Sequence, residues 1–209
     1  MAHARILLTG FGPFPDVPEN ASAWLVNRLA SHLRASDLPA EIHTAILPVD
    51  WHRGPHRVQR LLARVKPHIA LHFGVSGAAR GFVIEQRARN ACAALPDATG
   101  ALPECTHVEP QGPRIRFVAL PVPEIVAALR GLKLPVTRSK DAGAYLCNAV
   151  LYTSLASSVA SRNHAVTGFI HIPAVIGPDG PLSQDDALRG GLAILAACVQ
   201  AREGCKNFC

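Results

Sequence analysis

One cysteine stands where a helix is expected to begin, a position that favours nucleophilic chemistry. Cys147 lies in the segment 141–148, which follows one predicted strand and opens a predicted helix. The positive end of the helix dipole and the unpaired N–H groups of the first turn favour a thiolate over a thiol, and the thiolate is the attacking form. The alternative is a small buried hydrophobe, the usual role of a free cysteine.

A histidine 24 residues further along the chain is the candidate base. His171 lies near the end of a predicted strand. When a helix leaves the carboxyl edge of a parallel sheet and the next strand returns, the start of the helix and the end of the strand meet at that edge. An imidazole there can take the proton of Cys147 and later protonate a leaving amine. Taken alone, a histidine in an apolar strand is more often a core residue with its hydrogen bonds satisfied.

A carboxylate completes the candidate set. Glu85 lies downstream of the strand that ends near Gly74. A carboxylate against the second imidazole nitrogen fixes the tautomer and stabilises the imidazolium. The alternative is an ordinary surface glutamate beside Arg87 and Arg89.

Two phenylalanines lie in a Gly-Pro loop, residues 9–14, after the first strand. The loop lacks the later glycine of a dinucleotide fingerprint and the lysine of a phosphate loop. Phe11 and Phe14 can instead wall a small flat ligand, although core packing is the alternative.

A metal site is not expected. His52 and His56 are four residues apart, but Gly54 and Pro55 between them argue against a helix, and no glutamate completes a zinc-peptidase pattern. We therefore predict no metal site.

Alternating strands and helices must position these groups. Helical spacing is clear at Val58, Leu61, Leu62 and Val65, in a helix expected after Pro55. Further helices are expected after a possible N-cap at Asn20 and over 124–132, 144–158 and 184–202, and strands over 6–8, 42–49, 69–73, 115–120, 134–138 and 165–172. This order predicts an α/β protein: a single-domain three-layer α/β/α structure over 1–209, with a mostly parallel open twisted sheet.

The alternation of predicted strands and helices is interrupted between about residues 82 and 112. We expect a strand or hairpin over 83–89 and then an exposed loop, and loops of this length are usually lids or disordered.

Composition limits the function classes. The chain has 209 residues, of which 49% are hydrophobic and 17% charged, which excludes an intrinsically disordered protein. No apolar run approaches a membrane span of about 20 residues, and the first ten residues contain no secretion signal, so we expect a cytoplasmic protein without a membrane partner. The net charge is +6, but the basic residues are scattered and aromatic residues are few, so nucleic acid is not the expected partner.

The six cysteines include no C-x-x-C spacing, which favours free thiols in a reducing compartment. Cys205 and Cys209 fall in a polar tail, where we expect exposed thiols without a role. A homo-oligomer is possible.

With these segments in view, the chain resembles the pyroglutamyl peptidases, also called pyrrolidone-carboxylate peptidases, a family of cysteine peptidases. The matching segments follow the family's order along most of the chain. They are residues 8–14 with Asn20 and Ser22, residues 73–77, Glu85 with Ala88 and Asn90, residues 139–148, and residues 168–173.

The resemblance implies a catalytic triad and a substrate. Cys147 would be the nucleophile, His171 the base and Glu85 the orienting acid, and the enzyme would remove N-terminal pyroglutamyl residues from peptides without a cofactor. The same comparison implies that Phe11 and Phe14 flank the lactam ring, and that the backbone near Val75 and the side chains of Tyr145 and Leu146 line its pocket.

The pyroglutamyl end is a neutral cyclic amide. An aromatic pocket can accept it and reject an ordinary N-terminus, whose charge would be desolvated without a partner. Residues 92–112 look unlike typical members, which leaves an alternative: a non-catalytic lactam-binding homologue with a diverged lid.

Overall fold

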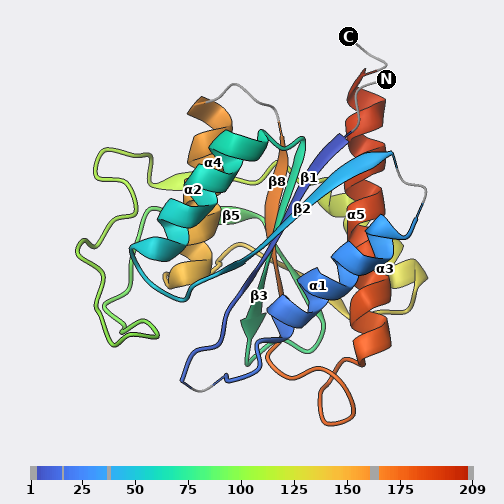
Figure 1. Cartoon of the computed structure of the whole chain (residues 1–209), viewed down its shortest axis with the longest axis horizontal. Helices are drawn as coiled ribbons and strands as arrows, with labels where there is room; N and C mark the ends of the chain where they lie inside the picture. Colours follow the sequence, from blue (N-terminus) through green and yellow to red (C-terminus); the bar gives the residue numbers. More distant parts are fainter. Residues whose placement is uncertain (1–3, 16, 37–38, 161–164, 207–209) are drawn as a thin grey trace.

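Helices cover both faces of a central sheet in the computed structural model (Figure 1), which describes residues 4–15, 17–36, 39–160 and 165–206. The sheet has the strand order β2-β1-β3-β8-β4-β7. Its strands are β1 (Ala4–Phe11), β2 (Ala40–Leu47), β3 (Ile69–Ser76), β4 (Phe82–Glu85), β7 (Val136–Ser139) and β8 (Val166–Pro173). The helices are α1 (Ala21–Arg34), α2 (Arg53–Val65), α3 (Val122–Gly131), α4 (Leu146–Ala160) and α5 (Gln184–Lys206).

The predicted α/β class with a mostly parallel sheet is confirmed. In Figure 1, α2 and α4 cover one face of the sheet, and α1, α3 and α5 cover the other. A separate apolar cluster fills each interface. Because both faces of the central strands are covered, their sequences are continuously apolar, as in β1, where Ile6, Leu7 and Leu8 are fully buried.

The connection from β1 to α1 is fixed by side-chain hydrogen bonds. Asn20 is the N-cap of α1, as predicted: its Oδ1 accepts from the Ser22 backbone N–H at 3.1 Å, and its Nδ2 donates to the Gly12 carbonyl at 3.0 Å. The Ser22 hydroxyl in turn accepts from the Phe11 N–H at 2.9 Å. A Cβ on Gly10 would lie 2.6 Å from the Ser22 carbonyl oxygen, so this close approach of strand and helix requires glycine.

The segment expected as a strand or hairpin over 83–89 is extended, but it is divided at Gln86 and does not fold back on itself as a hairpin. It is two short strands, and the second, β5 (Arg87–Arg89), pairs with β6 (Ile115–Phe117) in a separate two-stranded sheet. The predicted strand over 115–120 is accordingly shorter. In the main sheet, β4 is antiparallel to β8 and parallel to β7. The hydrophobic pattern indicates that a strand exists but not which partner it takes.

The expectation that Gly54 and Pro55 exclude a helix is wrong. The helix α2 begins at Arg53, with His52 as its N-cap. Because the N–H groups of a first helical turn have no partner within the helix, proline there costs no hydrogen bond. The rings of His52 and His56 consequently stack, with centroids 5.9 Å apart.

Two further observations concern the described part of the chain. It contains no group of three or more side chains placed to hold a metal ion, and none of its helices is both long and apolar enough to cross a bilayer. The prediction of an exposed thiol at Cys209 falls on a residue outside the part of the chain that the structure describes. Cys205 falls within α5, which extends four residues beyond its predicted end at Arg202.

Candidate active site

Cys147 is the second residue of α4, so the structure places it in the first turn of a helix, as predicted. Its side chain is half-buried and faces β3. A Cβ on Gly74 would lie 3.0 Å from the Cys147 sulfur and 2.7 Å from the ring of Phe169. Glycine at this position therefore leaves the space that the sulfur and the ring occupy.

Glu85 and His171 form a buried pair on the sheet face that carries α4. The distance from His171 Nδ1 to Glu85 Oε1 is 2.9 Å, and the two residues are only 8% and 2% exposed. In the antiparallel β4–β8 ladder, Glu85 is opposite Phe169 and Val83 is opposite His171. Glu85 thus reaches His171 along the diagonal, a separation that a long side chain can bridge.

The same histidine faces Cys147. Gly74, whose missing Cβ makes room for the sulfur, is paired with His171 across the parallel β3–β8 ladder. Because Nδ1 of His171 is hydrogen-bonded to Glu85, Nε2 is the ring nitrogen that can interact with the Cys147 sulfur. The three candidate residues, far apart in sequence, therefore lie together.

The charge state of His171 follows from these neighbours. Burial lowers the pKa of His171, but the charge of Cys147 and a hydrogen bond to it, together with the hydrogen bond and charge of Glu85, raise the pKa to about 10. At neutral pH the ring is an imidazolium between two acidic groups.

Residues 93–101, which we call the strap, lie beside this site. The Tyr145 hydroxyl donates to the Pro96 carbonyl at 2.9 Å, and the Trp51 indole N–H donates to the Leu95 carbonyl at 2.8 Å. The Trp51 and Tyr145 rings meet edge to face, with centroids 5.2 Å apart. The segment is largely exposed, as expected, but its backbone is fastened to the β2–α2 connection and to the start of α4.

The carboxylate of Asp97 organises the strap. Its Oδ1 accepts from the backbone N–H and hydroxyl of Thr99 and from the Ala101 N–H, and its Oδ2 accepts from the Trp51 N–H at 3.0 Å. Asp97 is only 5% exposed. Burial raises its pKa, but the hydrogen bonds from Trp51, Thr99 and Ala101 outweigh burial and lower it.

Two buried amides hold the segment that leads into the strap. The Asn148 side chain accepts from the Arg89 N–H and donates to the Arg89 and Ala91 carbonyls at 2.8 to 3.0 Å. Asn90 exchanges hydrogen bonds with the backbone of Glu109 and also donates to Gly112. Asn148 follows Cys147 directly, so this contact also fixes the start of α4.

The five candidate ligand-contacting residues are not equivalent. Phe11 and Leu146 are 3% and 1% exposed and belong to the core between the sheet and the α2–α4 layer, with Phe11 packed against Phe169. Phe14, Val75 and Tyr145 are partly exposed. The core-packing alternative therefore holds for Phe11, whereas Phe14 and Tyr145 keep surface for a ligand.

A buried histidine also escaped the sequence analysis. His72, on β3, is fully buried, with Nδ1 2.8 Å from the Thr9 hydroxyl and Nε2 2.8 Å from the Ser154 hydroxyl. Burial lowers the pKa of His72 to about 3, so the ring is neutral. It ties β1, β3 and α4 together behind the site.

The fold and this site define a family. The family model for pyroglutamyl peptidase matches residues 4–187. A pyrrolidone-carboxylate peptidase of Clavibacter michiganensis is 33% identical over 201 residues, covering 94% of this chain and 92% of the relative. One from Thermococcus onnurineus is 32% identical over 172 residues, covering 82% of this chain and 84% of the relative. The chain belongs to the pyroglutamyl peptidase family.

Two solved structures of pyroglutamyl peptidases have the same fold as this chain. A mutant pyrrolidone carboxyl peptidase from Pyrococcus furiosus superposes with a TM-score of 0.85 at 27% identity, covering 95% of this chain and 99% of the other. The pyroglutamyl peptidase I from Bacillus amyloliquefaciens gives a TM-score of 0.84 at 28% identity, covering 94% and 96%.

Proposed function

We propose that this chain hydrolyses the amide bond that follows an N-terminal pyroglutamyl residue, with Cys147 as nucleophile, His171 as general acid and base, and Glu85 as the group that orients His171. The observation that carries the proposal is the buried Glu85–His171 pair beside the sulfur at the start of α4. Membership of the pyroglutamyl peptidase family supports the choice of substrate.

The first half of the reaction forms an acyl-enzyme. The Cys147 thiolate attacks the pyroglutamyl carbonyl carbon, and the S–C bond forms as the C–N bond breaks. The departing amine takes the proton of the His171 imidazolium. The backbone N–H groups at the start of α4 have no acceptor within the helix and are suited to stabilise the developing oxyanion.

The second half restores the enzyme. His171, now neutral, takes a proton from water, the resulting hydroxide attacks the thioester carbon, and pyroglutamate leaves with the S–C bond broken. The carboxylate of Glu85 holds the ring in one orientation through both steps.

The substrate pocket selects a neutral end group. Phe14, in the loop after β1, and Tyr145, two residues before Cys147, offer partly exposed aromatic surface, and the backbone near Val75 lies at the end of β3. A lactam can enter such a site without losing the hydration of a charge, whereas an α-ammonium group would lose it without gaining a partner.

Hydrolysis of a pyroglutamyl chromogenic amide tests the proposal, with the wild type, Cys147→Ser and a matched Cys105→Ser control. Cys105 is exposed and lies outside the site. We expect turnover by the wild type and the control, loss of nearly all turnover in Cys147→Ser, and inactivation of the wild type and the control by iodoacetamide. Activity that survives full alkylation removes Cys147 from the mechanism. Binding of 2-pyrrolidone by calorimetry without turnover instead supports the non-catalytic lactam-binding alternative.

A further inference from the structure

Two cysteines outside the candidate catalytic set lie on neighbouring segments of the chain. The Cys92 backbone N–H donates to the Thr106 carbonyl at 2.8 Å, so Cys92 is joined to the residue that follows Cys105. A disulfide requires Cα atoms no more than about 7 Å apart, and a backbone hydrogen bond brings two chain segments into that range. The absence of C-x-x-C spacing does not reveal such a pair, because the fold and not the sequence brings it together.

The side chains of these two cysteines act on each other. Both thiols are free, with Cys105 exposed and Cys92 half-buried. Burial raises the pKa of Cys92, and the charge of Cys105 raises it further. The other described cysteines lie elsewhere: Cys147 faces β3, and Cys198 is buried in the core on the opposite face of the sheet. Cys105 is therefore the partner that Cys92 can reach.

The two cysteines stand at the two ends of the strap. Cys92 immediately precedes residues 93–101, and Cys105 follows them closely. Between these ends the Ala98 N–H donates to the Val49 carbonyl at 3.0 Å, in addition to the hydrogen bonds from Trp51 and Tyr145. A bond between the two sulfurs would close the strap into a ring whose middle is fastened beside the candidate site.

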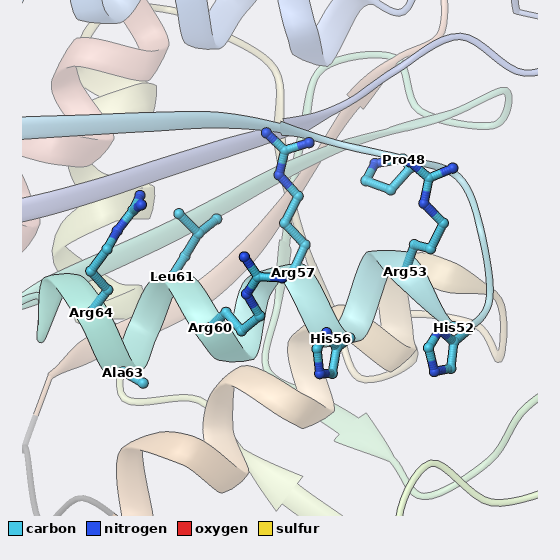
Figure 2. Close-up of a pocket in the computed structure, with 9 residues that line it drawn as sticks. All are labelled: Pro48, His52, Arg53, His56, Arg57, Arg60, Leu61, Ala63 and Arg64. Atoms are coloured by element: carbon cyan, nitrogen blue, oxygen red, sulfur yellow. The ribbon is translucent and has the colours of Figure 1, made fainter.

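The β2–α2 connection that holds the middle of the strap is tightly packed. Figure 2 shows the Pro48 ring beside the Arg53 side chain at the start of α2. A Cβ on Gly54 would lie 2.9 Å from the Pro48 carbonyl oxygen, so the first turn of the helix lies directly against the connection. Because the helix fixes this anchor, an added bond has its largest effect at the ends of the strap, where the cysteines are.

Cys92 also lies against the start of α4. The residue before it, Ala91, accepts from the Asn148 side-chain amide at 3.0 Å, and the residue after it, Ala93, donates to the Ala144 carbonyl at 2.7 Å. The segment that carries Cys92 is thus held between the start of α4 on one side and Thr106 on the other. A change at Cys92 acts next to the candidate site without replacing any of its catalytic groups.

We propose that Cys92 and Cys105 form a reversible disulfide that clamps the strap, so that oxidation strengthens ligand binding at the candidate site. Disulfides in reducing compartments are usually transient and redox-sensing, and an exposed thiol beside a half-buried one suits that role. The identity of the ligand rests on the proposed function, whereas the disulfide does not.

The oxidant is a small-molecule disulfide, such as oxidised glutathione. The exposed Cys105 thiolate attacks one of its sulfurs, the S–S bond of the oxidant breaks, and one glutathione thiolate leaves. The Cys92 thiolate then attacks the Cys105 sulfur of this mixed disulfide and displaces the second glutathione thiolate. The two protein thiols lose two electrons and two protons, and the oxidant becomes two molecules of reduced glutathione. An excess of reduced glutathione reverses both steps.

Peptide mapping tests the bond. Cys147→Ala, which removes the candidate nucleophile from the oxidation, is equilibrated with reduced and oxidised glutathione, alkylated and digested with trypsin. Residues 90–113 contain no Lys or Arg, so both cysteines fall in the peptide 90–114. After oxidation this peptide should resist alkylation and be lighter by two hydrogen atoms, and cleavage after Glu104 should leave its halves joined until they are reduced.

Cys92→Ser and Cys105→Ser in the same background are the controls, and neither should form the bond. A mixed disulfide that stays at Cys105 in the protein with both cysteines overturns the inference. A bond from Cys92 or Cys105 to any other cysteine also overturns it.

Hydrogen exchange tests the clamp. The Thr99 and Ala101 N–H groups donate to the Asp97 carboxylate, so their exchange reports the opening of the strap. We expect oxidation to slow this exchange about ten-fold, because a cross-link restricts the open states of the loop that it closes. Cys105→Ser after the same treatment should exchange like the reduced protein. A mapped disulfide with unchanged exchange overturns the clamp.

Calorimetry with 2-pyrrolidone connects the clamp to the site. A strap that is already held in place loses less freedom when a ligand binds, so oxidised Cys147→Ala should bind 2-pyrrolidone about three-fold more tightly than the reduced form. Equal affinities overturn the effect of oxidation on binding. Binding by neither form, together with no amide hydrolysis by the wild type, rejects the proposed function, while the mapped bond and the slowed exchange still support the clamp.

Discussion

Gly74 and His171 are paired across the β3–β8 ladder, and the space left by the missing Cβ of Gly74 is taken by the sulfur of Cys147. The smallest residue in the strand thus lets the nucleophile stand beside the imidazole. A side chain on residue 74 would compete with the sulfur for this space.

The substitution Gly74→Ala tests this relationship. Its methyl group would lie 2.7 Å from the Phe169 ring and 3.0 Å from the Cys147 sulfur, so one or both must move. Because small displacements of reacting groups reduce rates steeply, we expect kcat/KM for the pyroglutamyl amide to fall about 100-fold. Overpacking should lower the free energy of unfolding by about 1–3 kcal/mol.

Gly77→Ala is the matched control, since a Cβ there meets no atom within 4 Å. Retention of full activity by Gly74→Ala would show that the sulfur does not depend on this space.

The pH behaviour of His171 provides a second test. Burial lowers its pKa, while Cys147 and Glu85 together raise it to about 10. An NMR titration of the wild type should therefore show the His171 ring still protonated at pH 8.5. In Cys147→Ala the charge and hydrogen bond of the sulfur are lost, so the pKa should fall and the ring should titrate at lower pH. An identical titration in both proteins would mean that the sulfur and the imidazole do not interact.

The orienting role of Glu85 is tested by Glu85→Gln. The amide retains the shape of the side chain but not its charge, so the imidazolium loses a buried anionic partner 2.9 Å away. We expect kcat to fall roughly 100-fold or more, with a smaller change in KM, because Glu85 acts on the catalytic ring and not on the substrate. A purely structural role would instead lower thermal stability and leave kcat per folded molecule unchanged.

Acid should destabilise the protein through His72. Its pKa is lowered to about 3 in the folded state, against 6.5 for an ordinary histidine, so between these values the unfolded chain binds one more proton. The free energy of unfolding should consequently fall as pH drops from 6.5 toward 3, with a slope approaching about 1.4 kcal/mol per pH unit.

Urea unfolding of the wild type and His72→Gln over this range measures the effect. The variant should be less stable at pH 7 but should have a flatter pH dependence, while the exposed-histidine control His52→Gln should keep the slope of the wild type. Parallel curves for the wild type and His72→Gln would contradict the assignment.

Asp97 should position the strap. In Asp97→Asn one carboxylate oxygen becomes an NH2 group, which cannot accept from Trp51 or Thr99. The loosened strap no longer fixes Tyr145, so we expect KM for the pyroglutamyl amide to rise about ten-fold with little change in kcat, because the catalytic groups are untouched. Glu104→Gln, a charge loss at an exposed position nearby, is the control; an unchanged KM in Asp97→Asn would count against a role in the site.

How far the sequence predicts this site depends on the kind of contact. Cys147, His171 and Glu85 could be predicted because each follows or ends a recognisable element and because the surrounding segments resemble a family. The roles of Asp97 and Asn148 could not be predicted, because their partners are backbone groups tens of residues away, such as the Trp51 N–H and the Arg89 carbonyl. The prediction that Pro55 argues against a helix was wrong because proline breaks the interior of a helix but is tolerated in its first turn.

The pairing of β4 with β8 determines how long the carboxylate side chain at position 85 must be to reach His171. Alternate residues of a strand share a face, so positions 83 and 85 both point to the side that carries His171, the former directly opposite and the latter diagonal. At 85 an aspartate would be one methylene too short, whereas at 83 it would be long enough. A redesigned enzyme with Val83→Asp and Glu85→Gln would thus carry its carboxylate two residues earlier on the same strand and still place it beside His171.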